Sequence, residues 1–310
     1  MLNAKKVKNT VVFIIGKFIL YFILVSFAFV FLYPYIYMLT MSVKSYGDIM
    51  NITVKWLPRD FTLSNYKIAL MALNFPRSAI NSVLLTSIAT IAHLISCSFI
   101  GYGFARFRFI FRGFWFAVVL ISLVIPIQTI IIPQYINYVS FKMIDSYLPF
   151  IIPSFLGYGL RGGLFIFLFR QYFMRLPKSL EEAAAIDGCG IIKTFFKIAL
   201  PTAGPIILVT LVLSMVWHWN DYYEPSIYLS ANSKFALLPQ ILPSMYIMIE
   251  NIKSSPELMS AGWMSDMKFK FHEGVIMAGT AVATFPVLFA YLFLQRKFMQ
   301  GVERSGLTGE

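Results

Sequence analysis

Residues 18–43 read FILYFILVSFAFVFLYPYIYMLTMSV and contain no charged side chain. An α-helix rises about 1.5 Å per residue, so roughly 20 residues cross the ~30 Å hydrocarbon layer of a bilayer. Four more charge-free stretches are long enough to do so: 78–105, 113–141, 198–220 and 274–295. One such run could be the buried helix of a soluble protein, but five of them predict an integral membrane protein.

A sixth apolar segment, 147–169, is interrupted only by Arg161. We therefore predict an all-α fold with six spans, at about 18–41, 78–105, 114–138, 147–170, 203–223 and 274–295. Together they form one transmembrane domain, 18–298, between an N-terminal segment, 1–17, and a C-terminal tail, 299–310. The longest connection on the side of the termini, 171–202, joins the fourth span to the fifth.

Small residues in and near the spans predict close helix packing. Gly159 and Gly163 have the GxxxG spacing that lets helix backbones approach in a membrane. The same close approach is expected at Gly101, Gly103 and Gly157.

Composition excludes a soluble nucleic-acid binder. The 310 residues are 58% hydrophobic and 13% charged, whereas a soluble domain carries about 25% charged residues. The formal net charge of +12 comes mostly from Lys and Arg next to the termini and in the second-to-third and fourth-to-fifth connections. Because cytoplasmic loops are enriched in Lys and Arg, both termini are predicted to be cytoplasmic.

Motifs of soluble catalysis are absent from the sequence. It has no GxxxxGK[ST] loop for ATP, no HExxH zinc motif and no GxSxG elbow. Its three histidines have no metal-ligand spacing, and its two cysteines imply no disulfide framework. The charge-free runs also lack the carboxylates that proton-coupled carriers use. We therefore predict no catalytic residue, no metal site and no cofactor bound by this chain.

The 171–202 loop carries the most informative pattern, LPKSLEEAAAIDGCGIIKTFFKIALPTAGP at 176–205. Ser179 with Glu182 fits a helix-capping box, and Gly188 suits the left-handed position that ends a helix. A second apolar helix is expected from Ile191 until Pro201 stops it. A short helix of small residues could insert into a partner's cleft or lie on the lipid surface, and these two interpretations are equally supported by the residues alone.

This loop resembles the signature of ABC importer permeases, Glu-Ala-Ala, three residues, Gly, nine residues, Ile-x-Leu-Pro. The matching residues are Glu182, Ala183, Ala184, Gly188, Ile198, Leu200 and Pro201, with Asp187 before the glycine. Flanking segments are similar to the carbohydrate branch of that family, for example Phe169–Arg170–Gln171 and Trp219–Asn220–Asp221–Tyr222. Two features depart from it: Thr308 stands where Lys is usual, and the outer loop 235–273 is longer.

The resemblance implies the type I ABC importer permease fold in a bacterial plasma membrane, embedded in lipid. It implies a second homologous permease, two ATPase subunits that bind ATP-Mg, and an extracellular solute-binding lipoprotein that delivers a sugar. The residues implied to contact the ATPase are Ser179, Glu181, Glu182, Ala183, Ala184, Asp187, Gly188, Ile198, Leu200 and Pro201. A permease for a non-sugar solute, or a carrier or channel, remains an alternative.

Candidate substrate contacts each have a structural alternative. The outer end of the fifth span groups Trp217, Trp219, Asn220 and Tyr222, and the late third span has Tyr135, Asn137 and Tyr138. Their rings could stack on sugar faces or form an interfacial aromatic belt. Arg161, expected inside the fourth span, could attract an anionic sugar or pair with backbone carbonyls or a sister subunit.

Overall fold

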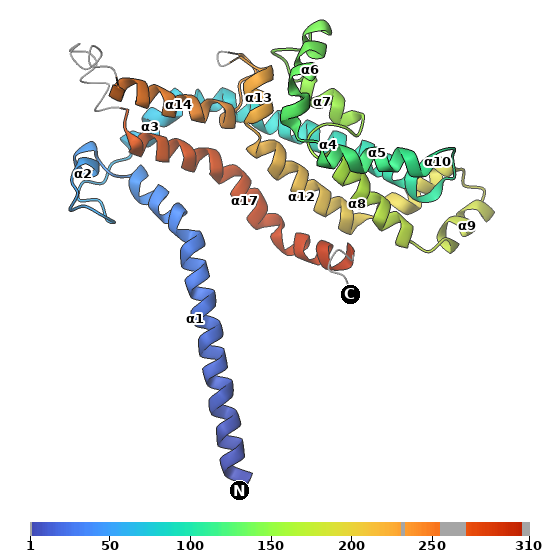
Figure 1. Ribbon diagram of the computed structural model, residues 1–310, viewed down its shortest axis with the longest axis horizontal. Coiled ribbons are helices and arrows are strands. Elements are labelled where there is room, and N and C mark those ends of the chain that lie inside the picture. Colours follow the sequence, from blue (N-terminus) through green and yellow to red (C-terminus); the bar gives the residue numbers. More distant parts are fainter. Residues whose placement is uncertain (1, 231–232, 255–270, 306–310) are drawn as a thin grey trace. The chain divides into compact units, whose positions relative to one another are not determined.

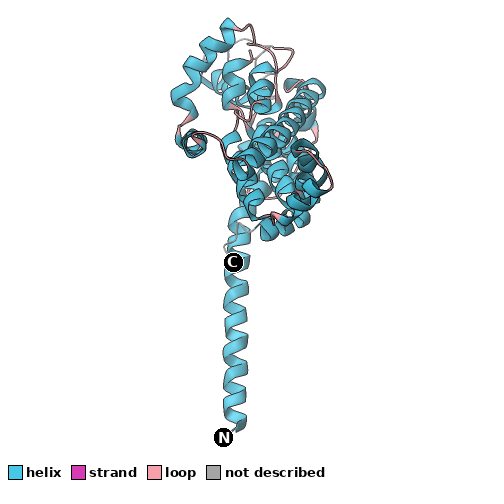
Figure 2. Ribbon diagram, turned by 90° about the vertical axis from the view of Figure 1, so that its right-hand side faces the viewer, coloured by secondary structure: helices cyan, strands magenta, loops and turns pink. Residues whose placement is uncertain are grey.

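The computed structural model describes residues 2–230, 233–254 and 271–305, which form helices joined by loops and contain no strand (Figure 2). In chain order (Figure 1) the elements are α1 Leu2–Ser42, α2 Tyr46–Met50, α3 Ser64–Ala72, α4 Phe75–Arg106, α5 Arg112–Val124, α6 Ile127–Ser140, α7 Leu148–Phe155, α8 Gly162–Arg175, α9 Ser179–Ile186, α10 Ile191–Thr194, the π-helical turn η1 Phe195–Ala199, α11 Leu200–Thr202, α12 Gly204–Asn220, α13 Tyr223–Tyr228, α14 Leu238–Ser254 and α17 Glu273–Ser305.

Three helices are long and apolar enough to cross a membrane, namely Val12–Ser42 of α1, Phe75–Arg106 and Glu273–Gly301 of α17. Two further apolar pairs are bent, α5 with α6 by 103° and α10–α11 with α12 by 77°. By length and composition the described helices therefore give three spans, or up to five if each bent pair is one span. Six spans would also require α7 and α8 to count as one, although residues 156–161 separate them.

Prolines and left-handed residues cause two of these breaks. Ile125 is extended, with ψ 119°, because the ring of the following Pro126 disfavours the helical region. Between α7 and α8, φ is +71° at Gly157, +89° at Gly159 and +63° at Arg161. A left-handed residue cannot continue a right-handed helix. The runs predicted as the third and fourth spans are thus apolar along their length but not straight.

The described residues pack as two compact units, which are described separately. The first combines α1–α3 with the C-terminal part of α14 and the N-terminal part of α17. Two residues after the end of α1, Lys44 is buried, and its Nζ donates hydrogen bonds of 2.9 Å to the carbonyls of Val54 and Lys55. These bonds satisfy an ammonium that burial would otherwise penalise. Of the loop 235–273, which was predicted to be an outer loop, residues 255–270 lie outside the described residues, as does Thr308.

The second unit contains α4–α13 with the remaining parts of α14 and α17. Its core is aromatic: Phe165, Phe169 and Phe173 recur every fourth residue along α8 and are fully buried. They pack in one cluster with residues of α4, η1 and α12, including Phe195 and Ile206. In Figure 1, α4, α8 and α12 run side by side through this unit. Both candidate sites described below are built on these three helices.

Two glycines bring the helices of this core together, as predicted. A Cβ at Gly101 of α4 would lie 2.6 Å from the Cβ of Phe169 in α8, and one at Gly163 would lie 2.7 Å from Ser122 Oγ in α5. Real Cβ contacts of that length do not occur, so only glycine permits these distances. Gly103 does not serve this purpose, because its nearest neighbour would be 4.0 Å away.

The GxxxG prediction was wrong for a structural reason. Gly159 lies in the α7–α8 break with a positive φ, whereas Gly163 lies in the first turn of α8. The two glycines therefore do not share one helix face. Gly157 also belongs to the break, where its left-handed conformation turns the chain.

Candidate functional site

The connection between α8 and α12 begins with the short helix α9, and Gly188 follows its C-cap residue, Asp187. The φ of Gly188 is +72°, which confirms the left-handed position predicted for it. The Cys189 N–H donates to the Ala184 carbonyl at 2.8 Å, and the Gly188 N–H donates to the Ala185 carbonyl at 3.1 Å. This pair of bonds is a Schellman motif, which satisfies the last carbonyls of the helix. The chain therefore leaves α9 in a fixed direction.

The capping box predicted at the start of α9 was wrong. Lys178 is the N-cap, no side chain caps the helix, and Ser179 is already helical. The N–H groups of Glu181 and Glu182 both donate to the Lys178 carbonyl, at 2.9 and 3.0 Å. Because the helix begins one residue earlier than predicted, the Ser179 side chain is past the position from which it could cap.

The two faces of α9 differ. On the inner face Ala184 is buried and Glu181 is half-buried. The outer face exposes Glu182, Ala183, Ala185 and Asp187, and Ile186 is 88% exposed. The outer face of α9 is therefore not covered by the rest of the described chain.

The inner face of α9 is fixed to the end of α4 by an ion pair. Arg106 Nε lies 2.8 Å from Glu181 Oε1, and the Tyr102 hydroxyl donates to the same oxygen at 3.2 Å. Arg106 Nη2 also donates to the Leu176 carbonyl at 2.7 Å. Sequence reasoning counted Arg106 only among the topology charges and assigned Glu181 to the ATPase contact, since no spacing rule relates two positions so far apart.

The second arm of the connection differs from its prediction in two ways. The helix does not stop at Pro201 but continues to Thr202, with a π-turn before it in which the Leu200 N–H donates to the Phe195 carbonyl. Proline lacks the N–H that would continue the α-ladder, so a wider turn precedes it. The expected apolar face is also divided: Phe195 is buried, whereas Ile191, Ile192 and Phe196 are exposed. Of the signature residues here, Ile198 and Leu200 are half-buried and Pro201 is exposed.

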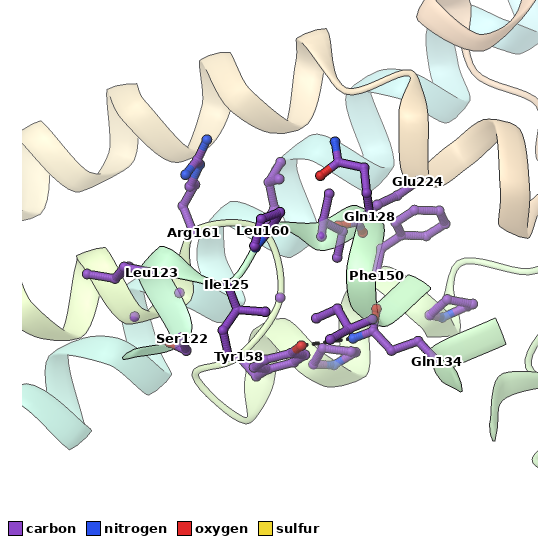
Figure 3. A pocket seen from close by; sticks show the side chains of 18 of the residues that line it. Ser122, Leu123, Ile125, Gln128, Gln134, Phe150, Tyr158, Leu160, Arg161 and Glu224 are labelled. Atoms are coloured by element: carbon purple, nitrogen blue, oxygen red, sulfur yellow. Dashed lines mark hydrogen bonds between the residues drawn. The ribbon is translucent and has the colours of Figure 1, made fainter. Parts of the chain in front are cut away.

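A cavity of about 380 Å³ lies in the second unit where the chain breaks. Its walls come from the α5–α6 bend, the α7–α8 break, the end of α12 and the start of α13. Figure 3 shows residues of these elements around it, among them Ile125, Tyr158 and Glu224. Broken helices in membrane proteins occur where the chain is buried in protein or lines a cavity, and this cavity follows that rule.

One wall of the cavity is polar and held in place. Gln134 Nε2 donates to the Tyr158 hydroxyl at 2.9 Å (Figure 3), and the Tyr228 hydroxyl donates to Gln134 Oε1 at 3.2 Å. These two bonds fix the direction of the amide. Tyr138 lines the same cavity. Hydroxyl and amide groups beside ring faces can bind a polar solute that has both hydroxyl groups and flat apolar faces.

Polar side chains of α4 support the break from behind. His93 Nε2 lies 3.0 Å from the Tyr158 carbonyl oxygen, and Ser96 Oγ donates to the Ser154 carbonyl at 2.6 Å. Backbone groups freed by a break need such partners when water is absent. His93 Nδ1 also lies 3.3 Å from His218 Nε2 of α12. Sequence reasoning found no role for His93. Its partner Tyr158 lies in the α7–α8 break, which the apolar composition of segment 147–169 did not predict.

Arg161 lies in the α7–α8 break and not within a helix of the segment predicted as the fourth span. It is the N-cap of α8, has a left-handed backbone and is exposed along the cavity wall. Its guanidinium carbon is 5.7 Å from the centroid of the Trp217 ring, a cation–π distance. It forms no ion pair with another described residue. A left-handed residue other than glycine is strained, so Arg161 is held at a cost of about 1–3 kcal/mol.

Glu224 also lines the cavity, and sequence reasoning did not identify it as functional. It is half-buried at the start of α13. Burial, and secondarily the nearby negative charge of Asp221, raises the pKa of the Glu224 carboxyl to about 8. The carboxyl is therefore mostly neutral at pH 7 and can both donate and accept a hydrogen bond.

The structure distributes the other predicted substrate residues outside this cavity. Trp219 is buried, and its Nε1 donates to the Ala283 carbonyl at 3.0 Å. Asn220 is exposed and bonds to the Val216 carbonyl of its own helix. Tyr135, Asn137 and Tyr222 are exposed and do not line the cavity.

The family model described as "binding-protein-dependent transport system inner membrane component" matches residues 97–304, which include the whole of α9 and the cavity. The chain belongs to this family. It is a transport subunit, an ABC transporter permease, rather than an enzyme.

Two curated relatives cover almost all of this permease. The arabinooligosaccharide transport system permease protein AraQ of Halalkalibacterium halodurans is 27% identical over 285 residues, 91% of this chain and 93% of AraQ. The polygalacturonan/rhamnogalacturonan transport system permease protein YtcP of Bacillus subtilis is 26% identical over 291 residues, 94% of this chain and 97% of YtcP.

A solved structure shares the fold of the permease. It is a bacterial ABC transporter involved in the import of the acidic polysaccharide alginate, and the match has a TM-score of 0.75 at 23% identity. The match covers 92% of this permease and 96% of that chain. The fold class given by the resemblance of the loop, an ABC importer permease, is thereby confirmed.

Proposed function

We propose that this permease forms one half of the membrane pathway of an ATP-driven importer for a sugar or oligosaccharide. The observation that carries the proposal is α9, a short helix of the importer signature whose inner face is tied to α4 and whose outer face is open. Relatives named for arabinooligosaccharide and polygalacturonan transport support a carbohydrate as the solute.

The proposed topology has six spans with both termini in the cytoplasm of a bacterial cell. It counts α5–α6 and α7–α8 each as one interrupted crossing and takes α12 as the fifth span. The support is the concentration of Lys and Arg near the termini, around Arg106 and in the connection that contains α9, because such residues mark cytoplasmic loops.

The proposed partners are a second permease, two ATPase subunits and an extracellular solute-binding lipoprotein. The exposed face around Glu182 and Ile186 would sit in a cleft of one ATPase, which binds the ATP-Mg. Closure of the ATPases would then displace α9 and shift the pathway between two states. This requires only that the ATPase contacts differ between the states.

The proposed solute path passes through the cavity at the helix breaks. Gln134 and Tyr158 would bond to hydroxyl groups, and Tyr138 would offer a ring face. Arg161 is the residue proposed to set the preference for charge, because a cation without an acidic partner among the described residues favours an anionic solute. Pairing with the second permease is the competing role for Arg161.

Reconstitution in proteoliposomes tests the proposal. The reconstituted complex contains this permease, the second permease and the ATPase subunits. It should accumulate labelled sugar only when ATP is on the side of the membrane that carries the ATPase and the binding protein is on the other side. A panel of neutral sugars, acidic sugars and non-sugar solutes defines the class. Accumulation that needs no ATP, or that occurs only for a non-sugar solute, would contradict it.

A further inference from the structure

We infer that the Arg106–Glu181 ion pair makes α9 move together with α4, so that displacement of α9 reaches the cavity instead of only bending the connection. The inference rests on the proposed function and adds to it the residues that transmit the motion. It assigns Arg106 and Glu181 as positioning residues. Neither would need to touch the ATPase or the solute.

The ion pair fixes the entrance to α9 at two points. Arg106 Nε lies 2.8 Å from Glu181 Oε1 as an ion pair, and the Tyr102 hydroxyl donates a hydrogen bond of 3.2 Å to the same oxygen. Arg106 Nη2 holds the Leu176 carbonyl at 2.7 Å, just before α9 begins. The Arg106 side chain is 7% exposed, so water competes poorly for these bonds and an unpaired charge there would be costly.

The exit from α9 returns to the same place. Phe195 of η1 is buried, and its ring centroid is 5.1 Å from that of Tyr102 and 6.3 Å from that of Phe173 in α8. Tyr102 therefore contacts the entrance through its hydroxyl and the exit through its ring. With both ends of the connection held against α4 and α8, α9 has little freedom to move alone.

The remaining step leads along α4 to the cavity. Arg106 is the last residue of α4, and His93 lies about 20 Å back along the same helix by its helical rise. His93 contacts the Tyr158 carbonyl in the cavity wall at 3.0 Å. Between them Gly101 packs directly on Phe169 of α8. An unbroken helix in close contact with α8 thus joins the ion pair to the break that lines the cavity.

A double-mutant cycle tests this inference in the reconstituted complex. The variants are Arg106→Gln, Glu181→Gln and the double variant. The matched control is Arg108→Gln, because Arg108 is an exposed arginine two residues after Arg106, between α4 and α5. The readouts are sugar taken up per ATP hydrolysed and co-purification of the ATPase. Each single variant should lower uptake per ATP about tenfold, because it leaves one charge unpaired. The double variant should recover to within about threefold of wild type, and the control should be unchanged.

The outcomes separate this inference from the proposed function. All variants should retain the ATPase, because the outer face of α9 is untouched. If single variants transport normally, if the losses in the double variant simply add, or if the ATPase no longer co-purifies, the inference is overturned although wild type transports. If wild-type protein shows no ATP-driven uptake, the proposed function itself fails.

Discussion

The α9 connection and the cavity both depend on left-handed residues, yet they use them in opposite ways. After α9, Gly188 is open: an added Cβ would meet no atom within 4 Å. At the cavity, Gly157 and Gly159 are enclosed, and added Cβ atoms would lie 2.5 Å from Ile100 Cδ1 and 3.2 Å from Ser154 Oγ. The first break presents a helix to an external surface, while the second turns the chain around an internal space.

This difference predicts which substitutions change transport only through the backbone conformation and which change it through side-chain contacts. Around Gly188 the backbone conformation matters and the surroundings do not. Around the cavity the charges and hydrogen bonds of Arg161, Glu224 and Gln134 matter as well. The following variants test each side of this comparison.

Gly188→Pro should have the largest effect. Proline fixes φ near −65° and removes the N–H that donates to Ala185, so the Schellman motif cannot form. We expect ATP-driven uptake to fall by roughly tenfold or more, measured in proteoliposomes. Gly190→Ala is the control, because Gly190 has φ −67° and open surroundings. Normal uptake by the Gly188→Pro protein would show that the ending of α9 is unimportant.

Arg161→Gln tests the charge of the cavity. If the unpaired guanidinium binds an anionic sugar, the variant should lose about tenfold in uptake of acidic sugars and little for neutral ones, since one charge-assisted bond is removed. The measurement is competition between the two classes in the same vesicles. Equal losses for both classes would remove Arg161 from specificity and leave it a structural role.

Gly101→Ala tests the contact between α4 and α8 on which both regions rest. The new methyl group would lie 2.6 Å from Phe169 Cβ, and overpacking of this kind costs about 1–3 kcal/mol. The Tm of the purified protein in detergent should fall. In Gly103→Ala, whose methyl group would have its nearest neighbour at 4.0 Å, the Tm should be unchanged. Equal Tm values for the two variants would contradict the packing described.

Glu224→Gln should have the smallest effect, and only at high pH. Burial raises the pKa of the Glu224 carboxyl to about 8, so the neutral form prevails at pH 7 and the charged form appears as the pH rises through 8. We expect uptake by wild type to decline about threefold between pH 7 and 9 as that charge enters the cavity. The variant, which cannot ionise, should show no such decline. Parallel pH profiles would mean that Glu224 does not titrate in the cavity.

Local patterns in the sequence predicted the features that neighbouring residues determine. The charge-free runs predicted apolar helices, and Gly188 was predicted to be left-handed because glycine tolerates that conformation. The capping role of Ser179 failed because the helix start depends on a shift of one residue, which local pattern does not resolve.

Long-range features were not predictable from the sequence. The glycines around Arg161 were interpreted as helix-packing residues in an apolar segment, so the sequence predicted a span there instead of a break. The pairing of Arg106 with Glu181 and the burial of Glu224 depend on how helices distant in sequence pack together. Hydropathy records how apolar a segment is but not where its axis bends, as at Pro126.

The central claim is that the outer face of α9 connects ATP hydrolysis to transport, and Glu182→Lys tests it most directly. Sugar uptake and the stimulation of ATP hydrolysis by the binding protein should be measured together in the reconstituted complex, with Arg108→Glu as an exposed charge reversal for comparison. We predict that Glu182→Lys abolishes both uptake and stimulation while Arg108→Glu preserves them. Normal uptake and normal stimulation in the Glu182→Lys complex would contradict the claim.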